Sequence, residues 1–242
     1  MTCVFVAGTD TDVGKTVVTA ALLTRLNQGG YRTLAMKPVA AGAEQTPDGL
    51  RNSDALALQQ AMSVEVPYES VNPVCLAPPV APHLAAAQIG QRLSARELYH
   101  AQQQLLDYPH DVLMIEGAGG WQVPLNDSES LADFARLCTN KVVLVVAMKL
   151  GCLNHALLSV ADIQREGVEV IGWVANQPQS EPMRLHEENL AWLTAQLQQR
   201  FNVPCLGSLP FLPAATAQQL ADHLLPSQEL MSVLQGKVAL LP

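Results

Sequence analysis

Short continuous apolar runs alternate with amphipathic segments along most of this chain. The apolar runs predict strands buried on both faces, and they cover residues 3–7, 33–39, 112–115, 142–148, 170–175 and 205–209. Between them, apolar residues spaced three and four apart predict helices over residues 17–28, 95–106, 154–164 and 185–199. This alternation is typical of βαβ units. It predicts an α/β fold of three layers, in which helices cover both sides of a mostly parallel central sheet.

Two stretches interrupt the alternation. Residues 66–82 hold five prolines and predict a loop or an irregular crossover, and residues 180–182 predict a second loop. The sequence shows neither an internal repeat nor a domain linker. We therefore expect a single domain over residues 1–225, followed by a C-terminal tail over residues 226–242 whose weak pattern predicts a loosely held segment.

The composition restricts the classes of function. Hydrophobic residues make up 49% of the 242 residues, which predicts a sizeable core. The formal net charge of −8 argues against binding to nucleic acid or to an anionic membrane surface. Apolar runs stay below the ~18 residues of a membrane helix, and the five scattered cysteines form no Cys-x-x-Cys pair. We therefore expect a soluble cytoplasmic protein without disulfides or zinc.

The segment Gly8-Thr9-Asp10-Thr11-Asp12-Val13-Gly14-Lys15-Thr16 joins the first predicted strand to the first predicted helix. A glycine-bounded loop ending in Gly-Lys-Thr at a helix N-terminus is typical of phosphate binding, because backbone N–H groups there point at an anion. Lys15 adds a charge for the β- and γ-phosphates, and the Thr16 hydroxyl suits Mg²⁺. Five residues separate the two glycines, one more than in the common form. The alternative is an ordinary strand-to-helix turn.

Polar side chains follow several predicted strands, at the edge where an open parallel sheet binds ligands. Glu116 ends one strand, and a carboxylate near Thr16 suits Mg²⁺. Asp54 is a second candidate ligand, although Ser53 and Asp54 also suit the start of a helix that runs to residue 62. Lys37 ends the second strand before a proline. A lysine there can neutralise a transferring phosphoryl group, and the alternative is a solvated surface lysine.

Two further strand ends carry polar residues. The segment 150–155 turns the strand 142–148 into a helix, with Asn154 as a candidate N-cap. Free N–H groups at this helix start can hold a carboxylate; an ordinary turn is the alternative. Asn176 follows another strand, and its amide can pair with an adenine edge. Gln177 follows Asn176, so the guanine-specific pattern Asn-Lys-x-Asp is absent, which argues against a GTPase.

Several segments together resemble the dethiobiotin synthetases, the ATP-dependent ligases of biotin synthesis, over residues 1 to about 225. The resemblance lies in the phosphate-binding segment and in the motifs Lys37-Pro38-Val39-Ala40, Gly49-Leu50-Arg51-Asn52-Ser53-Asp54-Ala55, Glu116-Gly117-Ala118-Gly119-Gly120-Trp121, Lys149-Leu150-Gly151-Cys152-Leu153-Asn154-His155-Ala156 and Gly172-Trp173-Val174-Ala175-Asn176. The five-residue loop and the Lys-Leu-Gly-Cys-x-Asn-His segment are its specific parts. The resemblance implies a P-loop NTPase-like fold and an ATP-dependent cyclo-ligase.

The resemblance also implies substrates, metal and site residues. It implies that 7,8-diaminononanoate and CO₂ form a carbamate that attacks ATP, with Mg²⁺ bound and dethiobiotin, ADP and phosphate as products. The implied catalytic residues are Thr11, Lys15 and Lys37, and the implied metal ligands are Thr16, Asp54 and Glu116. The implied contacts of ATP are Asp12, Val13, Gly14, Lys15, Thr16, Val17, Asp54, Glu116, Gly117, Ala118, Gly119, Asn176, Gln177, Pro210, Phe211 and Leu212. The implied contacts of the diamine are Lys37, Ala41 and, from a neighbouring subunit of a homodimer, Gly151, Cys152, Leu153 and Asn154.

Two positions depart from the pattern of this family. Ala41 stands where the family has a serine that contacts substrate, and residues 213–220 hold no acidic side chain for the ribose. Two other functions compete with the ligase. A partitioning-type ATPase switch usually carries a second lysine near the start of the loop, where Thr9 and Asp10 stand here. A related amidoligase needs a glutamine-hydrolysing domain, for which 242 residues leave no room.

Overall fold

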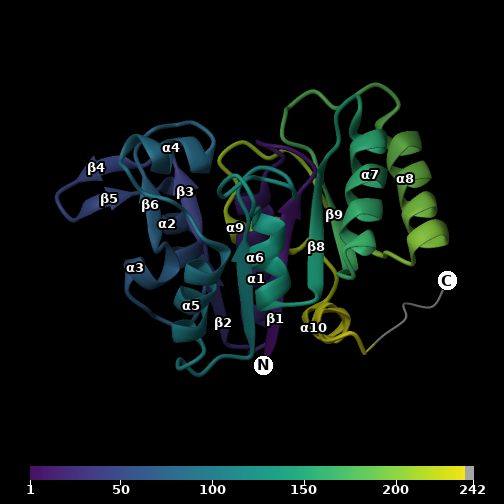
Figure 1. The fold of residues 1–242 in the computed structure, drawn as a ribbon. Helices are drawn as coiled ribbons and strands as arrows, with labels where there is room; N and C mark the ends of the chain where they lie inside the picture. The colour runs from purple at the N-terminus through teal and green to yellow at the C-terminus, as the bar shows by residue number, and fades with distance from the viewer. Residues whose placement is uncertain (238–242) are drawn as a thin grey trace.

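A six-stranded parallel sheet forms the centre of the computed structural model, which describes residues 1–237 (Figure 1). The strand order is β10-β9-β8-β1-β7-β2, and every neighbouring pair is parallel. The bounds are β1 Thr2–Gly8, β2 Thr33–Met36, β7 Val112–Glu116, β8 Lys141–Ala147, β9 Glu169–Asn176 and β10 Cys205–Leu209. The predicted α/β architecture with a mostly parallel sheet is therefore confirmed.

Helices lie on both sides of this sheet (Figure 1). Their bounds are α1 Lys15–Gln28, α2 Ser53–Ala61, α3 Tyr68–Val71, α4 Pro82–Gln88, α5 Ala95–Leu105, α6 Leu131–Cys138, α7 Cys152–Arg165, α8 His186–Phe201, α9 Ala217–Ala221 and α10 Ser227–Gln235. Helix α1 packs with α9 and α10, α5 packs with α6, and α7 packs with α8. Among residues 1–237, the helices are too short or too polar to span a bilayer.

Strand β1 lies inside the sheet between β8 and β7, and this position explains its apolar sequence. Phe5 of β1 packs edge-on against Trp121 and Phe134, with ring centroids 5.9 and 6.4 Å apart. Full burial of a side chain of this size stabilises a fold by about 1.5–3 kcal/mol. The register pairs Val6 with Glu116 and Gly8 with Val145. The loop after β1 therefore starts from a rigid base, level with the end of β7.

The predicted strand over residues 33–39 is wrong in its second half, because the chain leaves the main sheet at Lys37 and Pro38. Strand β2 ends at Met36, and a separate strand β3, Val39–Ala41, pairs in parallel with β6, Val74–Leu76. Proline has no N–H group for a sheet ladder. The N–H of Lys37 instead donates to the carbonyl of Val71 at 2.7 Å. Lys37 consequently stands at the junction of two sheets.

The proline-rich stretch 66–82 is more ordered than a loop. It contains α3 and β6, and α4 begins at its last residue. Pro67 precedes the first turn of α3 and Pro82 is the first residue of α4, positions where a fixed φ and a missing N–H are tolerated. A hairpin of β4, Glu44–Thr46, and β5, Gly49–Arg51, projects nearby (Figure 1). These elements are too short to show a hydrophobic period.

The C-terminal segment is also better packed than its weak pattern predicts. Helix α10 buries Leu230, Met231, Val233 and Leu234, and it packs against α1, β1 and β9. The side chain of Arg25 donates to the carbonyl of Leu225 at 3.0 Å, just before this helix. The expectation of a loosely held tail is thus wrong for residues 227–235, while its last five residues, 238–242, lie outside the described residues.

Candidate active site

The phosphate-binding segment forms a tight loop between β1 and α1. Asp12 and Gly14 adopt left-handed backbone conformations, with φ of 56° and 85°. A Cβ atom on Gly14 would lie 2.1 Å from Nδ2 of Asn176, so only glycine fits there. The same Nδ2 donates to the carbonyl of Val13 at 2.9 Å. The end of β9 therefore fixes the curvature of the loop, and Gly14 allows the contact.

Lys15 turns inward and joins the loop to the segment that follows β7. Its Nζ donates to the carbonyl of Gly119 at 2.7 Å and to that of Asp10 at 3.3 Å. Burial lowers the pKa of Lys15 to about 8, and the nearby charge of Lys37 acts in the same direction. Two carbonyls are partners that a phosphate oxygen can replace. Lys15 is therefore placed to meet an anion inside the loop.

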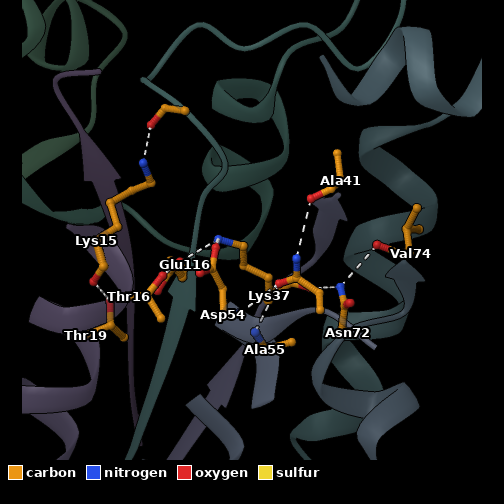
Figure 2. Close-up of polar contacts among 12 residues, drawn as sticks. Lys15, Thr16, Thr19, Lys37, Ala41, Asp54, Ala55, Asn72, Val74 and Glu116 are labelled. Carbon is orange, nitrogen blue, oxygen red and sulfur yellow. Dashed lines mark hydrogen bonds and ion pairs between the residues drawn. The ribbon is translucent and has the colours of Figure 1, made fainter. Parts of the chain in front are cut away.

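The side chains of Lys37, Asp54, Glu116 and Thr16 converge from the segment after β2 and from α2, β7 and α1 (Figure 2). Nζ of Lys37 lies 2.9 Å from Oδ2 of Asp54 and 2.5 Å from Oε1 of Glu116. The Thr16 hydroxyl donates to the same Oε1 at 2.8 Å. Lys37 and Glu116 are buried, while the side chain of Asp54 is partly exposed. The interpretation of Lys37 as a solvated surface lysine is therefore wrong.

The charged groups of this cluster stabilise the ionised forms of one another. Burial alone opposes a charged lysine, but the neighbouring Glu116 and Asp54 carboxylates hold the pKa of Lys37 above its ordinary value. Burial likewise opposes a charged Asp54, yet the Lys37 ammonium holds the pKa of this carboxyl below its ordinary value. Lys37 is thus a fixed positive charge near neutral pH, a few ångströms from the Thr16 hydroxyl that begins α1.

The sequence left open whether Asp54 binds a metal or caps helix α2, and the neighbouring Asn52 decides against the cap. Asn52 is the N-cap of α2, and its Oδ1 accepts from the backbone N–H groups of Asp54 and Ala55 at 3.1 and 3.3 Å. The helix start is thereby satisfied without the Asp54 carboxylate. That carboxylate points to Lys37 instead (Figure 2). Asp54 is therefore not the capping residue of the helix.

The oxygen atoms of this cluster fit Mg²⁺. Oε2 of Glu116 is buried and has no hydrogen-bond partner within the described residues, an arrangement that calls for an additional cation or donor. Thr16 and Asp54 supply a hydroxyl and a second carboxylate close by. Within residues 1–237 no three His, Cys, Asp or Glu side chains form a metal cluster. Two carboxylates suit Mg²⁺, because this ion usually completes its shell with water and phosphate oxygens.

A cavity of about 720 Å³ opens beside the cluster. Thr11, Lys37 and Asp54 line it on one side, together with Ala41 of β3. Residues 79–82 and 123–124 supply its apolar walls. The cavity therefore offers charge at one end and apolar contact elsewhere, as a ligand with an aliphatic chain requires.

The predicted adenine-binding residues also lie close together. Asn176 ends β9 and is buried, and the N–H of Gln177 donates to the carbonyl of Leu209 at 2.9 Å. Pro210, Phe211 and Leu212 follow directly at the end of β10. The side chain of Gln177 donates to the carbonyl of Gln179 in its own loop. This part of the predicted site thus borders the phosphate loop through Asn176.

The segment Gly151 to Asn154 is not among the residues that line this cavity. Gly151, with φ of 96°, is the N-cap of α7, and Cys152 begins the helix. The prediction of Asn154 as N-cap is therefore wrong; it lies inside the first turn and is exposed. Leu150 before the turn is 93% exposed. Lys149 connects the turn to the phosphate loop through an ion pair with Asp10 at 3.1 Å.

Three buried residues behind Lys37 were not predicted as part of the site. Asn52, Tyr68 and Asn72 form hydrogen bonds with one another and with the backbone at Lys37. Asn52 before Ser-Asp is a recognisable capping signal. Tyr68 and Asn72 lie in the proline-rich stretch, where no periodicity marks them. Their contacts depend on the crossover that brings α3 beside the end of β2.

Comparisons with known proteins agree with this geometry. A family model described as an AAA domain matches residues 2–219. The ATP-dependent dethiobiotin synthetase BioD of Pseudomonas aeruginosa strain UCBPP-PA14 is 49% identical over 224 residues, or 93% of this chain and 96% of that protein. BioD of Cellvibrio japonicus is 50% identical over 220 residues, with 91% and 94% covered, and BioD of Marinobacter nauticus is 48% identical over 208 residues, with 86% and 87% covered.

Solved structures show the fold alone. The MinC:MinD cell division complex of Aquifex aeolicus matches with a TM-score of 0.55 at 14% identity, covering 98% of this chain and 95% of that one. The cell division ATPase MinD of Pyrococcus furiosus matches with a TM-score of 0.54 at 16% identity, covering 97% and 98%. These likenesses confirm the P-loop NTPase-like fold. The identities of 48–50% with named relatives decide the family: the chain belongs to the ATP-dependent dethiobiotin synthetases.

Proposed function

We propose that this ATP-dependent ligase converts 7,8-diaminononanoate, CO₂ and ATP into dethiobiotin, ADP and phosphate. The observation that carries the proposal is the position of Lys37. Its ammonium lies between the Asp54 and Glu116 carboxylates, at the mouth of the phosphate loop and at the edge of the 720 Å³ cavity. A charge fixed between a nucleotide loop and a second ligand cavity suits transfer of a phosphoryl group between the two.

The phosphate loop holds the nucleotide in this proposal. Backbone N–H groups of Asp12 to Val17 surround the phosphates, and Lys15 exchanges its carbonyl partners for phosphate oxygens. Thr16, Asp54 and Glu116 are the residues that would hold Mg²⁺, which when bound neutralises phosphate charge. Glu116 to Gly119 form the far side of the phosphate site. Asn176, Gln177 and Pro210 to Leu212 border the adenine.

Lys37 acts on the reacting groups. One amine of the diamine bonds to the carbon of CO₂ and loses a proton, which gives a carbamate. A carbamate oxygen then attacks the γ-phosphorus, and the bond to the ADP oxygen breaks. The second amine attacks the carbamate carbon, loses a proton and expels phosphate, so that the ureido ring closes. Lys37 stabilises the negative charge on the transferring phosphoryl group, and Thr11 contacts the carbamate.

The diamine occupies the cavity beside β3. We assign the reacting end of the diamine to the part of this cavity that Thr11, Lys37 and Ala41 line. Ala41 offers only a methyl group there. We assign the carboxylate of the substrate to the N-terminus of α7 in a second subunit, at Gly151 to Asn154. The exposure of several large apolar residues on or near α7 and α8 supports this assignment, because apolar side chains grouped at a surface mark an interaction site. These residues are Leu150, Leu158, Leu185 and Trp192. We therefore propose that the protein is a homodimer. We also propose that it is cytoplasmic and binds neither nucleic acid nor membranes, in keeping with its net charge of −8.

Product analysis tests the proposal. The protein is incubated with Mg-ATP, bicarbonate and 7,8-diaminononanoate, and dethiobiotin, ADP and phosphate are measured. We expect the three products in equal amounts and no ADP without the diamine. Omission of bicarbonate from degassed buffer is the control for the carbon source. Turnover of ATP at the same rate without the diamine would contradict the ligase and favour the partitioning-type switch.

A further inference from the structure

The backbone of Lys37 is held from both sides by the end of α3. The N–H of Lys37 donates to the carbonyl of Val71 at 2.7 Å. The carbonyl of Lys37 accepts from Nδ2 of Asn72, also at 2.7 Å (Figure 2). Nδ2 donates in addition to the carbonyl of Val74 at 3.1 Å. Both polar groups of the Lys37 backbone are therefore satisfied by one short segment, at the point where the chain leaves the main sheet.

Tyr68 and Asn52 continue this chain of hydrogen bonds. The Tyr68 hydroxyl donates to Oδ1 of Asn72 at 3.0 Å and accepts from the N–H of Asn52 at 2.8 Å. Oδ1 of Asn52 accepts from the N–H of Asp54, whose carboxylate pairs with Nζ of Lys37. The hydrogen bonds thus form a closed ring that starts at the Lys37 backbone and ends at the Lys37 ammonium.

The members of this ring that were not predicted are almost fully buried. Asn52, Tyr68 and Asn72 expose 5%, 7% and 3% of their surface. Fully satisfied buried networks are rigid, because each unmade hydrogen bond leaves a desolvated polar group. A lysine side chain has four rotatable bonds, so its ammonium is fixed only when both its backbone and its charge have fixed partners. The ring supplies both.

We propose that Asn72, itself oriented by Tyr68, is a positioning residue. It holds the Lys37 ammonium in contact with the Asp54 carboxylate during phosphoryl transfer. The proposal rests on the catalytic role proposed above for Lys37. Asn72 acts on the backbone of Lys37, and Tyr68 acts on Lys37 through the Asn72 amide. Both residues therefore act on the rate of the chemical step, with little effect on ATP binding.

Steady-state kinetics of Asn72→Ala and Tyr68→Phe test this role. A displacement of about 1 Å in a catalytic group can cost about 10²-fold in rate. We expect kcat to fall about 10²-fold in Asn72→Ala and about tenfold in Tyr68→Phe, which keeps the aromatic ring under Arg51. The KM for ATP should change by less than about threefold in Tyr68→Phe, because its phosphate loop is untouched. Thermal melting curves report whether each variant is folded at the assay temperature.

A double-mutant cycle separates positioning from general stability. In a Lys37→Ala background, Tyr68→Phe should lower the residual kcat by less than about twofold, because the group that it positions is already absent. Asn27→Ala is the matched control. Asn27 holds the opposite end of β2, where Nδ2 donates to the Ala61 carbonyl at 2.8 Å and Oδ1 accepts from the Thr33 hydroxyl at 2.7 Å. This control should lower the melting temperature and leave kcat within about twofold.

The outcomes distinguish this inference from the proposed function. A wild-type kcat in folded Tyr68→Phe and Asn72→Ala, with Lys37→Ala strongly impaired, would overturn the positioning role and leave the ligase mechanism intact. An equal loss of kcat by Tyr68→Phe in both backgrounds would also overturn it. Full activity of Lys37→Ala would overturn the catalytic assignment of Lys37 and the positioning role together.

Discussion

Two buried lysines stand at this site, and their surroundings give them different properties. Within residues 1–237, Lys15 has only backbone carbonyls as hydrogen-bond partners, and burial lowers its pKa to about 8. Lys37 lies between two carboxylates, which hold its pKa above the ordinary value in spite of burial. Lys37 therefore keeps its charge near neutral pH, while Lys15 loses its charge as the pH rises through about 8. The Lys37 charge is balanced by two carboxylates, whereas the Lys15 charge has neutral carbonyls as its hydrogen-bond partners. An incoming polyanion is therefore attracted most strongly to Lys15.

ATP binding should therefore take up a proton at alkaline pH. The free protein carries the charge of Lys15 below about pH 8 and loses it above. Bound phosphates favour the charged form, so they raise the pKa of Lys15. Calorimetry of Mg-ATP binding in buffers of different ionisation enthalpy should show proton uptake at pH 9 and almost none at pH 7. Lys149→Met, which removes an exposed lysine near the loop, should behave like the wild type. Equal uptake at both pH values would contradict this assignment.

At the level of single residues, the sequence is informative where a side chain ends a buried strand. Lys37 and Glu116 were predicted for this reason, and the structure brings them within hydrogen-bond distance. Asp54 could not be assigned from its position, because the first turn of a helix accepts an aspartate for either purpose. Tyr68 and Asn72 carry no local signal at all. Their place depends on a tertiary crossing, which residue spacing does not encode.

At the level of elements, the predictable parts are those whose environment is uniform. Strands β1, β7, β8 and β9 are buried on both faces, so their apolar runs match the structure within two residues. The strand at β2 was predicted too long, because an apolar run does not show where Pro38 breaks the ladder. Helix α6 was missed, although its capping box of Ser130 and Asp133 is a readable signal. The hydrophobic pattern therefore does not by itself predict where a strand ends or where a capped helix begins.

The first turn of α2 offers a test at this scale. Asn52 already caps this helix, so Asp54→Asn should leave the fold intact. We expect the apparent affinity for Mg²⁺ in the assay to fall about tenfold or more, because one of the two carboxylates that we propose as metal ligands is lost. The melting temperature should change by no more than a few degrees. The measurement is a Mg²⁺ titration of activity at saturating ATP.

The matched control for this test is Asp133→Asn. Asp133 lies in the first turn of α6, where its carboxylate accepts from the N–H of Ser130 at 2.8 Å. The asparagine oxygen still accepts this hydrogen bond, but the negative charge at the N-terminus of α6 is lost. Stability should therefore fall by about 0.3–1 kcal/mol, and the Mg²⁺ requirement should stay unchanged. An Asp54→Asn protein with normal Mg²⁺ affinity and a lower melting temperature would return Asp54 to a purely structural role.

For the whole molecule, the topology assembles the site. Strands β1, β7, β9 and β10 end at one edge of the parallel sheet, and the break after β2 delivers Lys37 to the same edge. This convergence follows from the alternation of strands and helices alone. The number of subunits does not follow from it. The turn at Gly151 does not line the 720 Å³ cavity of its own subunit. In addition, several large apolar residues on or near α7 and α8 are exposed, namely Leu150, Leu158, Leu185 and Trp192.

Subunit complementation should therefore restore activity from two inactive proteins. Lys37→Ala removes the lysine that we propose as catalytic, and Gly151→Val strains the turn, because φ at Gly151 is 96°. If each site combines Lys37 of one subunit with the Gly151 turn of the other, a mixed dimer contains one intact and one doubly altered site. Equal mixing after dissociation gives half mixed dimers, so we expect about a quarter of wild-type activity. Mixing Lys37→Ala with Asp54→Asn is the matched control. It should give no more than the average activity of the two parent proteins at the same Mg²⁺ concentration, since both side chains contact each other within one subunit. If native mass spectrometry shows mixed dimers of the first pair and their activity stays at the level of the parents, the Gly151 turn belongs to no shared site.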